Sequence, residues 1–231
     1  MSYHLYHTDA LVLGSAPSGE GSKLIVLFTR DLGLITASAQ SVREERSKLR
    51  YGLQDFSYSD VTLVRGKEFW RLTNAALYEN MLDQGEERKA VQMVSRISKL
   101  LRRLLAGEEK NEPLFVSVLE GLQFVKTMRT TESMPCPAVA SREGGRKYEQ
   151  EAHTTPSIPL LIQGGEDALA GVEIVLVLRI LHLLGYLAPR NEFNPFLTHA
   201  DMWDEEVVSK ALLFRSLAIS EINNSLKESQ L

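Results

Sequence analysis

The fold is decided by residues 22–42, SKLIVLFTRDLGLITASAQSV. Two extended segments, 22–30 and 34–42, flank the tripeptide Asp31-Leu32-Gly33, whose glycine can take the positive φ of a three-residue hairpin connection. Apolar, partly β-branched residues fill the first segment, as they do in strands. We interpret this stretch as a β-hairpin.

Three more segments with strand character surround the hairpin. DALVLG (9–14) comes before it and is followed by the turn-rich SAPSGEG (15–21). After the long connection REERSKLRYGLQDFSY (43–58) come SDVTLVR (59–65) and EFWRLTNAALY (68–78), which turn at Gly66. Five short strands with a long connection between the third and fourth predict an OB barrel, whose closure removes exposed strand edges.

Beyond residue 80 the apolar pattern changes to a helical period. Residues 86–105 carry one apolar stripe, and Asn111 followed by Pro113 predicts the start of a second helix. A third helix is expected over 172–184, ending at Gly185. A last amphipathic helix is expected over 204–227, with its inward residues at Val208, Ala211, Leu212, Ile219 and Ile222.

The predicted fold class is therefore α+β, with an OB barrel over residues 1–80 and an all-helical domain over 81–231. Residues from about 130 to 170 lack periodicity and hold four of the eight prolines, which predicts a long mobile loop.

Composition restricts the class of protein. The 231 residues carry a net charge of −4, but the segment from Arg30 to Arg71 is +2 and the remainder −6, so a nucleic-acid partner is permitted. A single cysteine, Cys136, excludes an internal disulfide and suits a reducing compartment. The N-terminus lacks the pattern of a secretory signal, and residues 172–187 are too short and too polar to span a membrane. We expect a cytoplasmic protein.

Several motifs, in this order, resemble a known family. They are DALVLG, KLIVLFTRDLGLITASAQ (23–40), RSKLRYGLQDFSYSDVTLVRG (46–66), LRILHLLGYLAP (178–189) and the C-terminal SLKESQL (225–231). Together they resemble the RecO family of bacterial DNA-repair proteins over most of the chain, excepting the region around 130–170.

The resemblance implies a non-enzymatic protein of the RecF recombination pathway, associated with the nucleoid. Such a protein binds single- and double-stranded DNA, anneals complementary strands and helps load RecA. Its implied partners are RecR and the C-terminal tail of single-stranded DNA-binding protein.

Two departures from the family pattern bear on function. Many members carry four zinc-binding cysteines, two of them just after the Gly-x-x-Pro sequence, where this chain reads RNEFNPFL (190–197). The segment after the third strand is usually more basic, whereas here it is Ala39-Gln40-Ser41 followed by Glu44 and Glu45. We therefore expect no metal and no cofactor. We also expect Glu44 and Glu45 to weaken the affinity for DNA.

The candidate DNA-binding residues are the cations of the barrel. On an OB barrel, a groove beside the long connection at 43–58 can hold a phosphate backbone while aromatic side chains stack on bases. The cations are Arg30, Arg43, Arg46, Lys48, Arg50, Arg65, Lys67 and Arg71, and the nearby aromatics are Tyr51, Phe56, Phe69 and Trp70. The alternative is that Arg43 and Arg46 pair with Glu44 and Glu45, and that Phe56 and Trp70 are core residues.

A second candidate surface is the basic face of the helix over 86–105. Arg96, Lys99 and Arg103 lie mostly opposite its apolar stripe and would suit an acidic, aromatic-ended peptide such as the tail named above. The alternative is a solvated amphipathic helix.

The sequence lacks recognised catalytic motifs, with no phosphate loop, His-Glu-x-x-His or Gly-x-Ser-x-Gly, and its His and Cys spacing predicts no zinc tetrad. The leading interpretation is a non-enzymatic DNA-binding mediator. Its main alternative is a protein–protein adaptor with the same fold and little DNA contact, and a third is an OB protein that acts on RNA.

Overall fold

The computed structural model describes residues 4–82, 88–132, 165–188, 190–197 and 203–228. Its strands form one closed barrel in the order β1-β2-β3-β5-β4. They are β1 (Leu5–Ser18), β2 (Ser22–Thr29), β3 (Gly33–Ala39), β4 (Ser57–Val64) and β5 (Trp70–Asn80), with the short helix α1 (Leu49–Gly52) between β3 and β4. The predicted OB-type barrel and the mixed α+β class are confirmed.

The hairpin at 22–42 forms as predicted. β2 pairs antiparallel with β3, from Lys23 opposite Ala39 to Thr29 opposite Gly33. Gly33 has φ 70°, the left-handed conformation that the three-residue connection needs. The barrel closes by a parallel contact in which Ala37 lies opposite Trp70.

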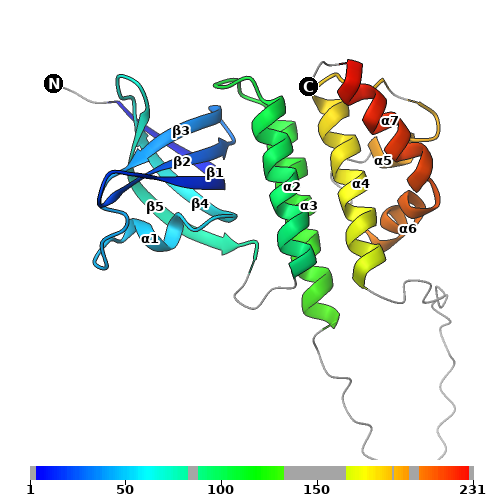
Figure 1. Ribbon diagram of the computed structural model, residues 1–231, viewed down its shortest axis with the longest axis horizontal. Helices are drawn as coiled ribbons and strands as arrows, with labels where there is room; N and C mark the ends of the chain where they lie inside the picture. Colours follow the sequence, from blue (N-terminus) through cyan, green and yellow to red (C-terminus); the bar gives the residue numbers. More distant parts are fainter. Residues whose placement is uncertain (1–3, 83–87, 133–164, 189, 198–202, 229–231) are drawn as a thin grey trace, which may run out of the picture.

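Within the described residues, six more helices follow the barrel and lie to its right in Figure 1. They are α2 (Arg88–Leu104), α3 (Glu112–Glu132), α4 (Gly165–Leu183), α5 (Asn194–Leu197), α6 (Glu205–Leu213) and α7 (Arg215–Glu228). In that view α2 and α3 stand between the barrel and the other four helices.

Alternation along the strands divides the barrel's apolar residues between two cores. Inward residues such as Val12, Ile25 and Leu27 fill the barrel. Outward residues Leu11 and Phe28 instead join the core formed by the helices. The barrel and helices therefore share one continuous packed interface.

The predicted helix ends are largely confirmed. Asn111 Oδ1 accepts a hydrogen bond from Leu114 N at 3.1 Å, and Asp204 Oδ1 accepts one from Val207 N at 2.7 Å, as helix-capping side chains do. Gly185 has φ 78° just beyond α4. α4 begins at Gly165, earlier than expected.

The expected single helix over 204–227 is wrong, because the chain breaks between Leu213 and Arg215 into α6 and α7. Both pieces pack on α4, and each contributes a buried alanine, Ala211 and Ala218. Ile219, expected inward, is 42% exposed.

The expected loop from about 130 to 170 is narrower than predicted, since α3 extends to Glu132 and α4 begins at Gly165. Its central part, 133–164, lies outside the described residues. Among the helices that are described, none is long and apolar enough to cross a membrane.

Candidate nucleic-acid interface

The connection between β3 and β4 is held to the barrel at both ends. Arg43 N donates to Gly21 O at 3.0 Å, and Val42 is buried in the barrel core. At the other end Gly52 O accepts hydrogen bonds from Ser57 Oγ at 3.1 Å and Ser59 Oγ at 2.7 Å. These contacts fix the backbone that carries the cations between them.

Four exposed cations project from this anchored connection, and we call them the α1 cluster: Arg43, Arg46, Lys48 and Arg50. Within the part of the chain that the structure describes, no ion pair joins them to Glu44 or Glu45. The alternative pairing is therefore absent from this conformation. Tyr51 on α1 is 67% exposed and available for stacking, whereas Phe56 is half-buried.

The turn between β4 and β5 carries a second group of candidates. Lys67 and Phe69 are exposed, as is Arg71 at the start of β5. Gly66 is required here, because a Cβ would lie 2.1 Å from Phe69 O. The turn therefore presents one aromatic ring and two cations to solvent.

Arg65, in contrast, is engaged within the protein. Its guanidinium forms a salt bridge with Glu108 and lies 4.7 Å from the centroid of the Trp70 ring. Trp70 Nε1 donates to the other Glu108 oxygen at 3.0 Å, and Trp70 is 4% exposed, as its interpretation as a core residue predicted. The Arg65 hydrogen bond, helped by that of Trp70, lowers the pKa of Glu108.

Arg30 lies at the junction of the barrel and α3. It pairs with Asp9 at 3.2 Å, and its guanidinium lies 5.5 Å from the centroid of the Phe115 ring. The structure therefore does not bring all eight predicted cations together. The α1 cluster stands apart in sequence from the β4–β5 turn, and Arg30 and Arg65 already have protein partners.

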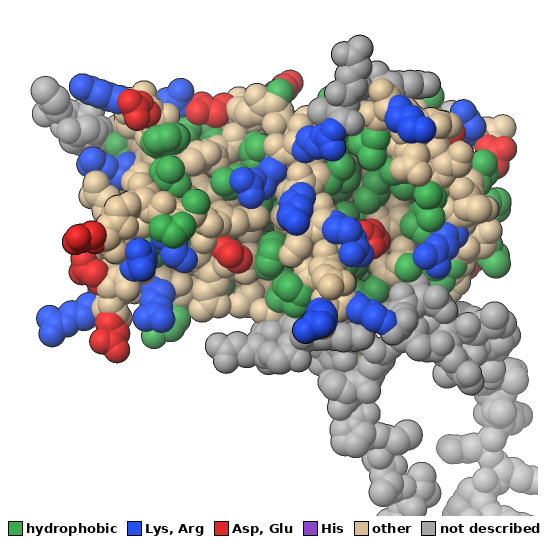
Figure 2. Space-filling model, in the orientation of Figure 1, with side chains coloured by type: hydrophobic (Ala, Val, Ile, Leu, Met, Phe, Trp, Pro, Cys, Tyr) green, Lys and Arg blue, Asp and Glu red, His purple; other side chains and the backbone are tan. Residues whose placement is uncertain are grey.

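The basic face of α2 is present as predicted. Figure 2 shows Lys and Arg side chains gathered over the central helices, with hydrophobic side chains beside them. Lys99 and Arg103 are exposed. Arg96 is instead engaged by Glu173 of α4, with Nε and Nη2 each 2.6 Å from a carboxylate oxygen, which raises the pKa of Arg96.

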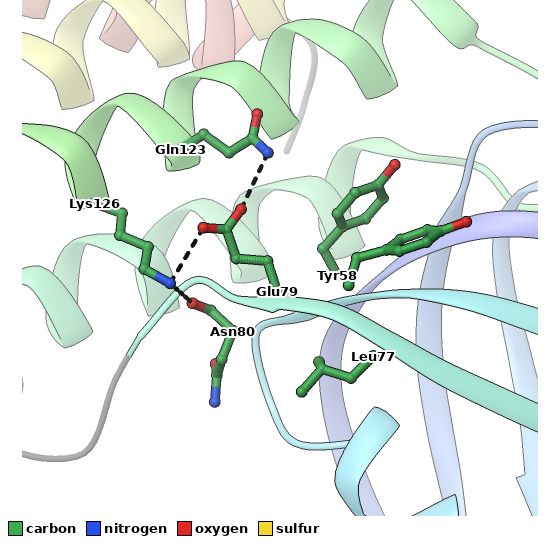
Figure 3. A pocket seen from close by; sticks show the side chains of 7 residues that line it. Tyr58, Leu77, Glu79, Asn80, Gln123 and Lys126 are labelled. Carbon is green, nitrogen blue, oxygen red and sulfur yellow. Dashed lines mark hydrogen bonds and ion pairs between the residues drawn. The ribbon is translucent and has the colours of Figure 1, made fainter.

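A pocket of about 680 Å³ lies where β4 and β5 meet α3, and no sequence motif predicted it (Figure 3). Its residues come from β4, β5 and α3, which are separated in sequence, so no local motif contains them all. Aromatic and apolar side chains line one part and polar ones the other: Tyr58, Leu77, Tyr78, Glu79, Gln123 and Lys126. Burial, followed by the charge of Asp9, raises the pKa of Tyr58 to about 12.

No group of three or more His, Cys, Asp or Glu side chains that could hold a metal occurs among the described residues. Cys136, His153 and His199 lie outside them. The expectation of a metal-free protein therefore stays a prediction.

A five-stranded OB-type barrel joined to helices defines a mixed α+β protein, with exposed cations on the connection before its fourth strand. The family model for the N-terminal part of recombination protein O matches residues 1–81, which cover the whole barrel.

Curated relatives extend the match beyond the barrel. The DNA repair protein RecO of Dehalococcoides mccartyi is 30% identical over 133 residues, which cover 58% of this chain and 52% of the relative. That of Pelotomaculum thermopropionicum is 31% identical over 121 residues, covering 52% and 47%. That of Desulfitobacterium hafniense is 44% identical over 63 residues, covering 27% and 23%. These matches support a RecO-family protein, with the N-terminal barrel matching that family's model, and the chain spans about half the length of the first two relatives.

Proposed function

We propose that this chain is a non-enzymatic DNA-repair protein of the RecF recombination pathway. It binds single- and double-stranded DNA, promotes annealing of complementary strands and helps load RecA onto DNA coated with single-stranded DNA-binding protein. The relatives' shared name, DNA repair protein RecO, supports the repair role and names no enzymatic activity.

The observation that carries the proposal is the α1 cluster. Its four exposed cations sit on a backbone anchored at Gly21 and Gly52, and within the described residues none of them is neutralised by Glu44 or Glu45. An anchored backbone loses little freedom when its side chains contact phosphates, and each contact releases condensed counterions. Exposed Tyr51 adds a ring on which a base can stack.

The second element of the proposal concerns protein partners. Lys99 and Arg103 on α2 provide exposed positive charge, next to half-buried Leu100, for the acidic tail of single-stranded DNA-binding protein. RecR is a further partner, for which we assign no residues.

The adaptor alternative is favoured by different observations. The net charge is −4, and two of the eight candidate cations, Arg30 and Arg65, are paired with carboxylates. An adaptor would retain the partner surface on α2 while contacting DNA weakly.

A titration of fluorescent oligothymidylate with the full chain, repeated from low to physiological salt, separates the two functions. A mediator that contacts phosphates loses affinity steeply, with a log–log slope of about −0.7 for each contact on a single strand. Absence of binding even at low salt would reject the DNA-binding proposal in favour of the adaptor.

A further inference from the structure

The pocket between the barrel and α3 contains an exposed aromatic ring and a set of polar side chains that bind one another. Glu79 Oε1 pairs with Lys126 Nζ at 3.2 Å, and Glu79 Oε2 accepts a hydrogen bond from Gln123 at 3.2 Å (Figure 3). Lys126 Nζ also donates to Asn80 O at 2.9 Å. The two charged groups that line the pocket thus neutralise each other, and these contacts join β5 to α3.

Tyr78 is the aromatic residue that the pocket leaves open. Its ring centroid is 5.0 Å from that of Tyr58, with the planes tilted by 44°, yet 57% of Tyr78 is exposed. Neighbouring Leu77 is 43% exposed. An exposed ring supported from one side by a second ring is a surface on which a flat, uncharged ligand can stack.

The pocket adjoins the connection that carries the α1 cluster. Asn80, which lines the pocket, donates through Nδ2 to Gln54 Oε1 at 2.9 Å, just beyond α1. α1 itself packs on β5, where a Cβ at Gly52 would lie 2.9 Å from Ala75 O. The connection that carries the α1 cluster therefore meets one edge of the pocket, and a DNA strand bound to the cluster can continue along β5 towards it.

The charges around the pocket select the part of a nucleotide that it can take. Asp60 lies opposite Asp9 where β1 pairs with β4, and its negative charge acts on Tyr78 and would repel a phosphate there. Asp9 is neutralised by Arg30, as Glu79 is by Lys126. The surroundings are neutral to acidic, so they suit a base and exclude the backbone phosphates.

We infer that the pocket is a base-binding subsite, in which an unpaired nucleobase of single-stranded DNA stacks on Tyr78 while neighbouring phosphates contact the α1 cluster. This inference rests on the proposed function. The volume of about 680 Å³ lies in the range of small-ligand pockets, roughly 300–1,000 Å³. The subsite favours single strands, because a base within a duplex is not free to enter it.

The test compares oligothymidylate with an abasic oligomer of equal length, which has the same phosphates and no bases. Removing the ring in Tyr78→Ala is expected to weaken oligothymidylate binding roughly 5- to 150-fold, the range found for loss of one base–aromatic stack. Binding of the abasic oligomer and the salt slope should not change, because no phosphate contact is lost. Tyr78→Phe should bind like the wild type.

Two outcomes would overturn the subsite. One is unchanged oligothymidylate binding by Tyr78→Ala, which points to a protein ligand for the pocket. The other is an equal loss for both oligomers, which indicates a structural role for Tyr78. Tyr186→Ala, at another tyrosine that is 38% exposed, is the matched control and should leave both affinities unchanged. The salt dependence of wild-type binding tests the proposed function separately. If the wild type binds oligothymidylate with a steep salt slope while Tyr78→Ala binds unchanged, the base-binding subsite is rejected and the proposed function is retained.

Discussion

Glu108 accepts a hydrogen bond from Trp70 Nε1 at 3.0 Å, joining the connection between α2 and α3 to the first residue of β5. The same carboxylate pairs with Arg65, and the adjoining Gly107 O accepts a hydrogen bond from Leu34 N at 3.0 Å. Lys110 pairs with Asp31 at 2.9 Å. This connection therefore fastens two barrel turns to the helices.

The two functions of the Glu108 carboxylate can be separated by substitution. Glu108→Gln keeps an acceptor for Trp70 and loses the ion pair, whose partners are 60% and 44% exposed, so the expected loss in free energy of unfolding is below about 1 kcal/mol. Glu108→Ala also removes the acceptor from a buried indole and should cost about 1–3 kcal/mol. Urea unfolding measures both, and equal losses would contradict the role given to Trp70.

The ion pair also makes a pH prediction. The folded-state pKa of Glu108 is lowered from its ordinary value of 4.5, so its stabilising contribution is present above about pH 4.5 and is lost as the pH falls through the folded pKa. The difference in free energy of unfolding between wild type and Glu108→Gln should therefore shrink on acidification. A difference that grows instead would contradict the sign of this pKa shift.

Gly33 is expected to tolerate no side chain. Its φ is 70°, and a Cβ would lie 2.3 Å from Glu109 O, so Gly33→Ala combines backbone strain with a clash against the α2–α3 connection. Gly19→Ala is the matched control, since its φ is 74° and nothing lies within 4 Å. Gly19→Ala should cost about 1 kcal/mol and Gly33→Ala clearly more, as measured by urea unfolding. An equal loss in free energy of unfolding for the two variants would show that the α2–α3 connection can move to accommodate the new methyl group.

The α1 cluster is tested by replacing Arg46, Lys48 and Arg50 with alanine together. If each contacts a phosphate, the log–log salt slope for oligothymidylate flattens by roughly 2, and strand annealing falls with binding. The fold should survive, because the side chains are exposed. The control replaces Lys210, Arg215 and Lys227 in α6 and α7, which changes the net charge equally. A slope that both triple variants leave unchanged would remove the α1 cluster as the site.

The basic face of α2 is tested with an acidic, aromatic-ended peptide. Lys99→Ala with Arg103→Ala should weaken peptide binding at least several-fold, because both charges are exposed, while oligothymidylate binding stays unchanged. Fluorescence anisotropy of the labelled peptide measures the effect. Peptide binding that survives this double substitution would support the alternative of a solvated helix face.

The barrel could be predicted from the sequence because its signals are local. Alternating apolar residues, Gly33 in the hairpin and the capping side chains Asn111 and Asp204 act within a few residues of themselves. The resemblance to the RecO family rested on ordered motifs in the strands, which the family model matches, and on two further motifs at 178–189 and 225–231 that lie beyond it. The cations of the α1 cluster were predictable for the same reason, since they belong to one exposed connection.

The sequence by itself therefore determined the strands, most of the helix ends and the location of the exposed cations. Only the tertiary structure decided which cations are engaged, because Arg65 meets Glu108 across 43 residues and Arg96 meets Glu173 across 77. It also decided the break between α6 and α7, both of which pack on α4. The pocket at Tyr78 arose in the same way, since hydrogen bonds between β5 and α3 join side chains that no local pattern relates.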